Sequence, residues 1–225
     1  MKGIFLSLEI ILIVFGAIFF ISVLKISNLE KKIKSLVENI SQDRRVQLVI
    51  IAWAFTALIE GSAGFGAPAI LASAILIALN FPIVQAVIFS LVGSAIHTSF
   101  GAVGTPIVFG FGASLAQSDV LIFLQNQNLS FTEFLGGIAV NIAFFNLFIG
   151  VAICFIMMFL LIFIFNKEGK NKIKHFLEII PFITIASLLV TIPAYLISVF
   201  FGPELPSLIG GLIGLFLILI IAQKS

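Results

Sequence analysis

The segment from Glu60 to Pro68 has the residue types that an ion-binding site inside a membrane requires. It reads Glu-Gly-Ser-Ala-Gly-Phe-Gly-Ala-Pro and lies within apolar sequence that runs from Val46 to Phe81. A charge in hydrocarbon costs several kcal/mol, and backbone groups that a broken helix frees there need hydrogen-bond partners. Both features are tolerated mainly around a cavity, so the segment indicates a transport site rather than a plain anchor.

A new helix is expected to begin near Pro68, because proline suits the first helical turn, where its missing N–H would have no partner anyway. The first amides of that helix, with the flexible backbone before it, would carry a partial positive charge suited to an anion. Discontinuous transporter helices hold substrate carboxylates at such ends. The candidate substrate-binding or coupling residues of this first break are Glu60, Gly61, Ser62, Gly64, Phe65 and Gly66.

A second interruption by glycine and proline runs from Ser99 to Pro106. Two broken elements in neighbouring spans point to one shared cavity, of which this segment would form the other wall. The alternative is that its glycines only permit close helix packing, as we expect for Gly210, Gly211 and Gly214 in the last span. The candidate residues of the second break are His97, Thr98, Gly101, Gly104 and Thr105.

Two ionisable side chains, Glu60 and His97, lie far from the ends of their apolar runs. We expect Glu60 to be a proton-coupled or substrate-coupled carboxyl group, and His97, Thr98 and Thr105 to be polar lining. For His97, a neutral imidazole bonded to a backbone carbonyl and a proton-relay role are both open. Asn141 and Asn146 would either line the cavity or bridge helices.

Composition defines the class of protein. Of the 225 residues 61% are hydrophobic and 10% are charged, and the mean hydropathy is +1.28. No soluble domain of this size hides so much apolar surface. The net charge of +2 is small and the basic residues fall in two short connecting segments, so no nucleic-acid partner is expected.

Enzyme signatures are missing from the sequence. There is no HExxH, GxSxG, CxxC or P-loop, and two histidines are too few for most metal sites. The single cysteine, Cys154, lies in an apolar run and suggests packing rather than reactivity. We expect no enzymatic activity, no catalytic residues, no metal and no cofactor.

Basic residues assign the sides of the membrane. Half of the twelve Lys and Arg residues lie between Lys25 and Arg45, and a second cluster runs from Lys167 to His175. The positive-inside rule makes both segments cytoplasmic. Within the first, apolar residues recur at three- and four-residue steps from Ile26 to Ile40. This pattern predicts an interfacial amphipathic helix or, alternatively, one that packs on the cytoplasmic surface of the protein.

The apolar run from Val46 to Phe81 is too long for one ordinary span, since its residues would extend about 54 Å as one helix against roughly 30 Å of hydrocarbon. We favour a helical hairpin, or a pair of short half-helices, that bends at Gly61 to Gly66 and returns to the cytoplasmic side near Asn80. Ile83 to Thr105 would then cross outward. Two ordinary spans joined by an external glycine turn would give the same sidedness.

The predicted fold class is an all-α polytopic membrane protein with about five full transmembrane helices, a glycine-broken helical hairpin and one interfacial amphipathic helix. Residues 1–225 would form a single transmembrane domain. Its predicted parts are a first span at 1–24, a cytoplasmic amphipathic linker at 25–45, a glycine-broken transport-site region at 46–108 and the remaining spans at 134–225.

The segment from Leu58 to Pro68 resembles the hallmark of the lactate permease family of bacterial monocarboxylate transporters. In this hallmark three glycines, a phenylalanine and a proline follow Leu-x-Glu at fixed spacing. Further segments that match the family, in the family's order, are Asp43–Gln47, Phe100–Ile107 and Gly202–Pro206.

The resemblance implies uptake of L-lactate, glycolate and related short 2-hydroxy acids coupled to protons, by a multi-pass protein of the bacterial cytoplasmic (inner) membrane. Family members are roughly twice as long and continue past this C-terminus. The chain would then be a permease, or a truncated or split half that needs a complementary chain or a homo-oligomer. A transporter of another small organic anion is the further alternative.

Local departures from the family pattern lie close to the second break. Ser94 and Ala95 stand where an Asn-Thr pair is expected, and His97 replaces a proline. The family's basic residue near the start of the following helix has no counterpart around Val140.

Overall fold

The computed structural model describes residues 29–165 and 171–223, together with single positions between residues 8 and 27. Every regular element in these ranges is a helix, which confirms the all-α class. The predicted first span at 1–24 lies largely outside the described residues, as do Lys167 and Lys170 of the second basic cluster.

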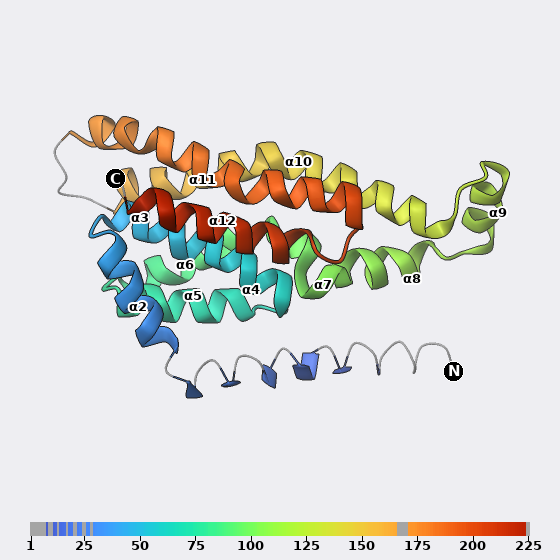
Figure 1. The fold of residues 1–225 in the computed structure, drawn as a ribbon, viewed down its shortest axis with the longest axis horizontal. Helices are drawn as coiled ribbons and strands as arrows, with labels where there is room; N and C mark the ends of the chain where they lie inside the picture. Colours follow the sequence, from blue (N-terminus) through green and yellow to red (C-terminus); the bar gives the residue numbers. More distant parts are fainter. Residues whose placement is uncertain are drawn as a thin grey trace.

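The described helices form an elongated bundle in which the long elements lie side by side (Figure 1). In chain order they are α2 (Leu29–Ile40), α3 (Arg44–Leu48), a π-helical stretch (Val49–Phe55), α4 (Thr56–Ser62), α5 (Ala67–Ala78), α6 (Ile83–Ser94), a 3₁₀ turn (His97–Phe100), α7 (Gly101–Thr105), a second π-helical stretch (Pro106–Phe111), α8 (Gly112–Leu115), α9 (Ser118–Asn126), α10 (Phe131–Phe159), a third π-helical stretch (Leu160–Phe165), α11 (Lys172–Phe201) and α12 (Pro206–Ala222).

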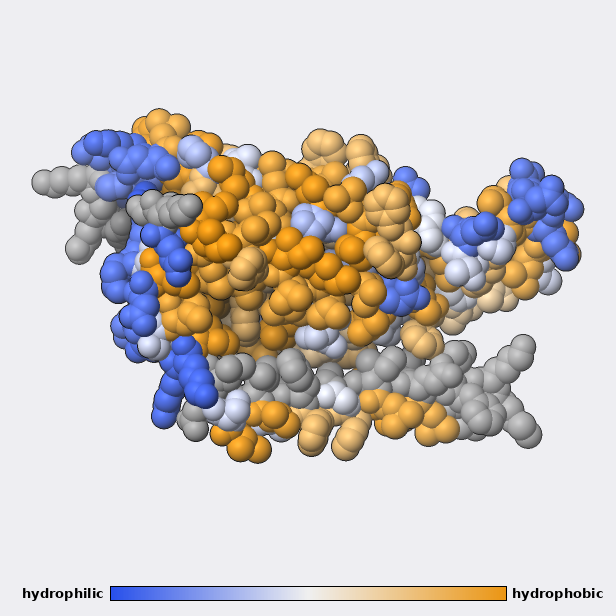
Figure 2. Space-filling model, viewed as in Figure 1, coloured by the Kyte–Doolittle hydropathy of each residue, from blue (hydrophilic) through white to orange (hydrophobic). Residues whose placement is uncertain are grey.

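Within the described residues, four runs have the length and apolar composition to cross a membrane: Arg44–Ser62, Phe131–Phe165, Lys172–Phe201 and His97–Leu115, the last interrupted by left-handed residues at 102–104. Three shorter apolar helices, α5, α6 and α12, accompany them. Figure 2 shows hydrophobic side chains over the middle of the bundle, with hydrophilic residues gathered at the end that carries α2 and α3 and around α9 at the other end. This distribution is that of a polytopic membrane protein.

The predicted bend and return of the chain are present. The chain runs from Arg44 to Ser62, turns, and returns through α5 to Asn80, whose carbonyl oxygen accepts a hydrogen bond of 2.8 Å from the Arg44 guanidinium. The same guanidinium lies 4.4 Å from the centre of the Phe81 ring. The two ends of the hairpin therefore meet at the end of the bundle where the basic residues gather.

The predicted span from Ile83 to Thr105 is not one continuous helix. Its first part, α6, ends at Ser94, and the chain resumes as a helix at Pro106 after a 3₁₀ turn and left-handed residues. Left-handed backbone cannot continue a right-handed helix, and Pro106 provides no amide to bond backward. The crossing is therefore two half-helices with the second break between them.

The centre of the bundle is the π-helical stretch Val49–Phe55, all of whose residues are buried. Trp53 is fully enclosed, and its indole N–H donates to the carbonyl oxygen of Ala186 in α11 at 3.3 Å. The glycines Gly210, Gly211 and Gly214 bring α12 against α11 and α4, with a Cβ at Gly211 placed 2.7 Å from Ala57 backbone. Their predicted role in helix packing is confirmed.

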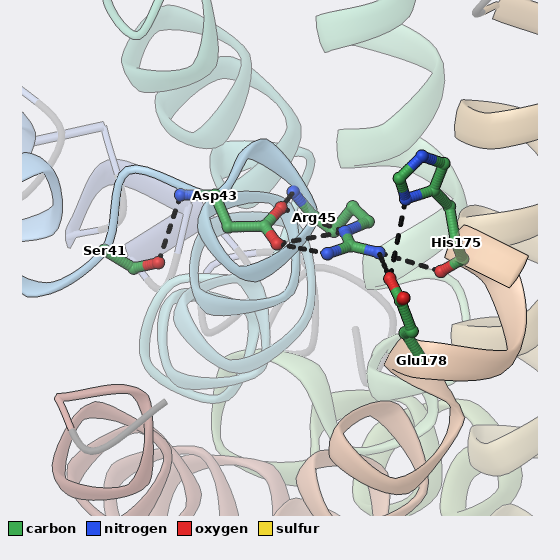
Figure 3. Close-up of polar contacts among 5 residues, drawn as sticks. All are labelled: Ser41, Asp43, Arg45, His175 and Glu178. Carbon is green, nitrogen blue, oxygen red and sulfur yellow. Dashed lines mark hydrogen bonds and ion pairs between the residues drawn. The ribbon is translucent and has the colours of Figure 1, made fainter. Parts of the chain in front are cut away.

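The two basic segments meet, as the positive-inside prediction requires, and Figure 3 shows Arg45 of the first beside His175 of the second. Arg45 donates to the Asp43 carboxylate at 2.6 Å and to the carbonyl oxygen of His175 at 2.8 Å. Its guanidinium also lies 3.8 Å from the Glu178 carboxylate. Helix α2 packs on the same end through Ile33, buried Val37 and Ile40, which favours the packing interpretation of its amphipathic pattern for these residues.

The Asp43 carboxylate caps α3 by accepting from the Arg45 amide at 2.8 Å. Burial raises the pKa of Asp43, but hydrogen bonds and the charge of Arg45 outweigh burial, so the pKa lies below its usual value. A depressed folded-state pKa contributes stability that is complete above the unfolded-state value and is lost as the pH falls through the folded-state value.

We therefore expect the wild-type chain to lose more stability than Asp43→Asn when the pH falls from about 6 to about 3, across the usual range of an aspartate pKa. Thermal unfolding of the detergent-purified chains measures the difference. Glu38→Gln is the matched control, because Glu38 belongs to a more exposed pair with Lys34, 3.7 Å apart. An equal loss of stability in wild type and Asp43→Asn would contradict the assignment.

Candidate functional site

The first break is a left-handed turn between α4 and α5. After Ser62, the backbone takes positive φ at Gly64 (58°), Phe65 (47°) and Gly66 (83°) before α5 begins at Ala67. Pro68 lies in the first turn of α5, as predicted. Positive φ at a bulky residue such as Phe65 is uncommon, and such strain persists only where the surroundings fix it.

Some backbone amides of this turn have no backbone hydrogen-bond acceptor among the described residues. The Ala67 amide donates to the Gly64 carbonyl at 2.9 Å and the Ile70 amide to the Gly66 carbonyl at 3.3 Å. Over the described part of the chain, the amides of Phe65 and Gly66 have no such bond. They are donors at the N-terminus of a helix, where the backbone carries partial positive charge.

The second break contains three consecutive left-handed residues, Ala102 (φ 43°), Val103 (φ 56°) and Gly104 (φ 73°). Two of them are not glycine, and the left-handed conformation costs roughly 1–2 kcal/mol per ordinary residue. Strain of this kind gathers at sites where the backbone must be held in a special shape.

The two breaks lie against each other. A Cβ built on Gly64 would stand 2.9 Å from the amide nitrogen and the Cβ of Ala102. A Cβ built on Gly101 would stand 2.5 Å from Oε1 of Glu60. The first contact leaves no room for a side chain at Gly64, and the second places the Glu60 carboxyl group directly on the second break.

Both breaks line one cavity of about 490 Å³. Its lining residues are Glu60, Gly64, Phe65, Gly66, Thr98, Gly101, Ala102, Thr105, Pro106, Phe109 and Gly110. Glu60 is 5% exposed, and within the described residues its carboxyl group makes no hydrogen bond or ion pair. Seven of the eleven predicted site residues therefore surround one space.

The cavity combines a carboxyl group with few other polar groups. The hydroxyls of Thr98 and Thr105 donate to the carbonyls of Ala95, at 2.7 Å, and Ala102, at 2.5 Å. Each hydroxyl oxygen keeps lone pairs that can accept a hydrogen bond from a guest. No group of three potential metal-ligating side chains occurs in the part of the chain that the structure describes.

The other four predicted residues lie outside this cavity. Gly61 faces α12, where a Cβ would meet the Leu208 backbone, and Gly104 faces Pro203 and Glu204. The Ser62 hydroxyl donates to the Ile59 carbonyl at 3.1 Å within its own helix. Gly61 and Gly104 thus permit close approach of neighbouring backbone, which was the alternative for glycines of this kind.

His97 points away from the Glu60 cavity into a small space among α10, α11 and α12. Its ring centre is 4.7 Å from that of Trp53, and its Nε2 atom has no hydrogen-bond partner among the described residues. Nearby, Asn146 donates to the carbonyl oxygen of Ile96 at 3.2 Å. Asn146 therefore bridges helices, whereas Asn141 donates to Gly137 in its own helix at 2.9 Å.

Apolar helix continues on both sides of the breaks. Asn146 of α10 donates to the carbonyl oxygen of Ile96, which precedes the second break, and the sequence from Phe134 to Asn146 extends about 18 Å toward α9, by the helical rise per residue. The π-helical stretch Pro106–Phe111 and α8 form a second apolar element that leads toward α9. The first break adjoins a cavity, and Phe65 at the turn is 53% exposed.

Comparison with known proteins decides the family. The family model for L-lactate permease matches residues 1–224. The chain belongs to the L-lactate permease family. It is 34% identical to a putative L-lactate permease of Haemophilus influenzae over 96% of this chain and 36% of that protein. With the L-lactate permease of Bacillus subtilis it shares 31% identity over 81% of this chain and 28% of that protein.

A third member of the L-lactate permease family, from Escherichia coli K12, is 28% identical over 85% of this chain and 30% of its own length. The chain thus spans about a third of the length of these curated relatives. No solved structure matches this chain.

Four cavity residues of this L-lactate permease family member were not predicted: Ala102, Pro106, Phe109 and Gly110. Phe109 lies four residues after Thr105, so the two share one face of a helix, and Pro106 and Gly110 have the same spacing. That helical spacing was the available signal. No sequence signal pointed to Ala102, because alanine rarely adopts left-handed backbone.

Proposed function

We propose that this chain builds part of the substrate site of a permease that takes up L-lactate or a related short 2-hydroxy monocarboxylate such as glycolate, together with a proton, across a bacterial cytoplasmic membrane. The observation that carries the proposal is the cavity in which two broken helices and one buried carboxyl group meet. The family membership agrees with it.

The lining matches the two ends of a 2-hydroxy acid. The amides of Phe65 and Gly66 and the N-terminus of α5 provide donors and partial positive charge for the substrate carboxylate. The oxygens of Thr98 and Thr105 provide acceptors for the substrate hydroxyl. Phe65, Pro106 and Phe109 provide an apolar wall for the short carbon chain.

Protonation of Glu60 would couple the binding of a proton to the binding of the substrate anion. Two carboxylates in one cavity repel each other, and a proton on Glu60 removes the repulsion and supplies a donor. Import of a monoanion against an inside-negative potential costs about 2.3 kcal/mol per 100 mV, which one co-transported proton cancels. Binding of proton and substrate to the same cavity would therefore be mutually supportive.

We expect Glu60→Gln to abolish the accumulation of labelled L-lactate in cells that express the chain, because Gln cannot release a proton. In detergent, lactate should still raise the unfolding temperature of the variant, since the half-helix donors remain. Equal uptake by wild type and Glu60→Gln, above that of cells with an empty vector, would remove Glu60 from the mechanism.

A second candidate, a permease part that does not transport alone, is favoured by the third of the relatives' length that the chain spans. Absence of uptake above cells with an empty vector, together with thermal stabilisation by lactate, would support it. A complementary chain or a second copy of this chain would then complete the transporter. Competition by dicarboxylates or inorganic anions would instead identify a transporter of another small anion.

A further inference from the structure

A second hollow lies at the basic end of the bundle, far along α3 and α4 from the Glu60 cavity. It has a volume of about 550 Å³ and lies where α3, the start of α6, the π-helical end of α10 and the start of α11 come together. Its lining residues are Arg44, Arg45, Pro82, Gln85, Leu161, Ile162, Phe165, Lys172 and His175. The proposed substrate site shares no residue with it.

The charges on its wall are only partly neutralised. Arg45 is held by Asp43 and Glu178, and the imidazole of His175 lies 3.5 Å from Glu178 (Figure 3). Arg44 and Lys172 have no carboxylate partner among the described residues. Arg44 bonds the Asn80 carbonyl and Lys172 the Phe163 carbonyl, at 2.8 and 3.3 Å, so both are positioned while keeping their charge.

The opposite part of the wall is apolar. Leu161, Ile162 and Phe165 come from the last turns of the helix that begins at Phe131. Figure 2 shows that this end of the bundle is where the hydrophobic belt gives way to hydrophilic residues. A ligand that fits such a wall carries negative charge at one end and hydrocarbon at the other.

We propose that this hollow, formed around Arg44 and Lys172, binds the headgroup of an anionic phospholipid of the phosphatidylglycerol class. The phosphodiester accepts from the Arg44 fork and the Lys172 ammonium, and the Gln85 amide is placed to reach the glycerol oxygens. The acyl chains run along Leu161, Ile162 and Phe165. The lipid joins the base of the hairpin to α10 and α11.

Fluorescence of Trp53 can report lipid binding directly. It is the only tryptophan of the chain, and it lies nine residues beyond Arg44, about 14 Å along the helix by the rise per residue. Energy transfer from Trp53 to phosphatidylglycerol with a pyrene-labelled acyl chain measures binding to the full chain in mild detergent. Phosphatidylcholine with the same label, and inorganic phosphate as competitor, complete the set of probes.

We expect wild type to prefer phosphatidylglycerol over phosphatidylcholine. The double variant Arg44→Gln with Lys172→Gln should lose about 30-fold in phosphatidylglycerol affinity, the value for two lipid-facing cations, and keep its phosphatidylcholine affinity. The double variant Lys31→Gln with Lys32→Gln removes the same charge from exposed α2 positions and should keep the preference. Arg44→Lys with Lys172→Arg should keep it as well, which separates charge from folding.

Equal affinity of wild type for the two lipids would overturn the proposal. So would equal losses in the two charge-removing variants, since the preference would then follow net charge alone. Displacement of the labelled lipid by millimolar inorganic phosphate would show that the hollow takes a soluble anion rather than a lipid headgroup.

Discussion

Replacing Gly104 by alanine should unfold the second break and lower the free energy of unfolding by about 2–5 kcal/mol, from left-handed strain and overpacking together. Gly104 has a φ of 73°, and an added Cβ would stand 2.7 Å from the Pro203 carbonyl carbon and 2.8 Å from the Glu204 Cα. Both neighbours are backbone atoms of the connection before α12, so neither can turn aside as a side chain can. Unfolding in detergent and the amount of chain in the membrane measure the effect.

The matched control is Gly137→Ala in α10, where an added Cβ meets nothing within 4 Å. Alanine there should be neutral or stabilising, because it lowers the entropy of the unfolded chain and favours helix. If Gly104→Ala were as stable as Gly137→Ala, the close contact between the second break and the α11–α12 connection would be wrong.

The first break was predictable because its signals are local. A carboxylate and three glycines within an apolar run are energetically unusual whatever surrounds them, and Pro68 marks the helix start by its own covalent structure. That the chain must bend followed from length alone, since the run from Val46 to Phe81 as one helix exceeds the hydrocarbon thickness. The structure confirms the bend and its return to Asn80 beside Arg44.

The second break was harder, because its conformation depends on tertiary contacts. Ala102 and Val103 adopt left-handed backbone that their own types disfavour, so only the packing of Gly64 and Pro203 around them explains it. That turn divides the crossing predicted from Ile83 to Thr105. It also sets the direction of His97, which the sequence placed with the cavity lining and the structure places among α10, α11 and α12.

Helix rotation explains the remaining differences. Gly61 follows Glu60 directly, yet neighbouring helical residues point about 100° apart, and Gly61 meets α12 while Glu60 meets the cavity. The π-helical stretch before α4 changes which side of the helix the following residues face, and no local sequence pattern predicts it. A list of residues from one motif therefore mixes those that line the cavity with those that hold its wall against α12. The roles of all eleven as substrate or coupling residues remain predictions.

Gly101→Ala should disable the Glu60 carboxyl group without unfolding the chain. Gly101 has φ −66° and ψ 155°, a conformation that alanine accepts. Its added Cβ would stand 2.5 Å from Oε1 and 3.3 Å from Cδ of Glu60, so the carboxyl end must withdraw by nearly 1 Å to reach ordinary contact. A misplacement of that size costs up to about 100-fold in positioned catalysis, and we expect lactate uptake to fall about tenfold or more.

The double variant Gly101→Ala with Glu60→Gln decides whether the loss acts through Glu60. Because Glu60→Gln is expected to lose uptake but to keep lactate binding, the double variant is compared with it by the rise in unfolding temperature on adding lactate. If the loss acts through Glu60, that rise is no smaller in the double variant than in Glu60→Gln alone, because the same interaction is already gone. Gly110→Ala lines the same cavity with nothing within 4 Å of its Cβ and should retain uptake. Because the end of a flexible side chain is the closest neighbour of Gly101, its unfolding temperature should stay near wild type, in contrast to Gly104→Ala. A smaller stabilisation by lactate in the double variant than in Glu60→Gln would mean that Gly101 acts on the substrate directly and not through Glu60.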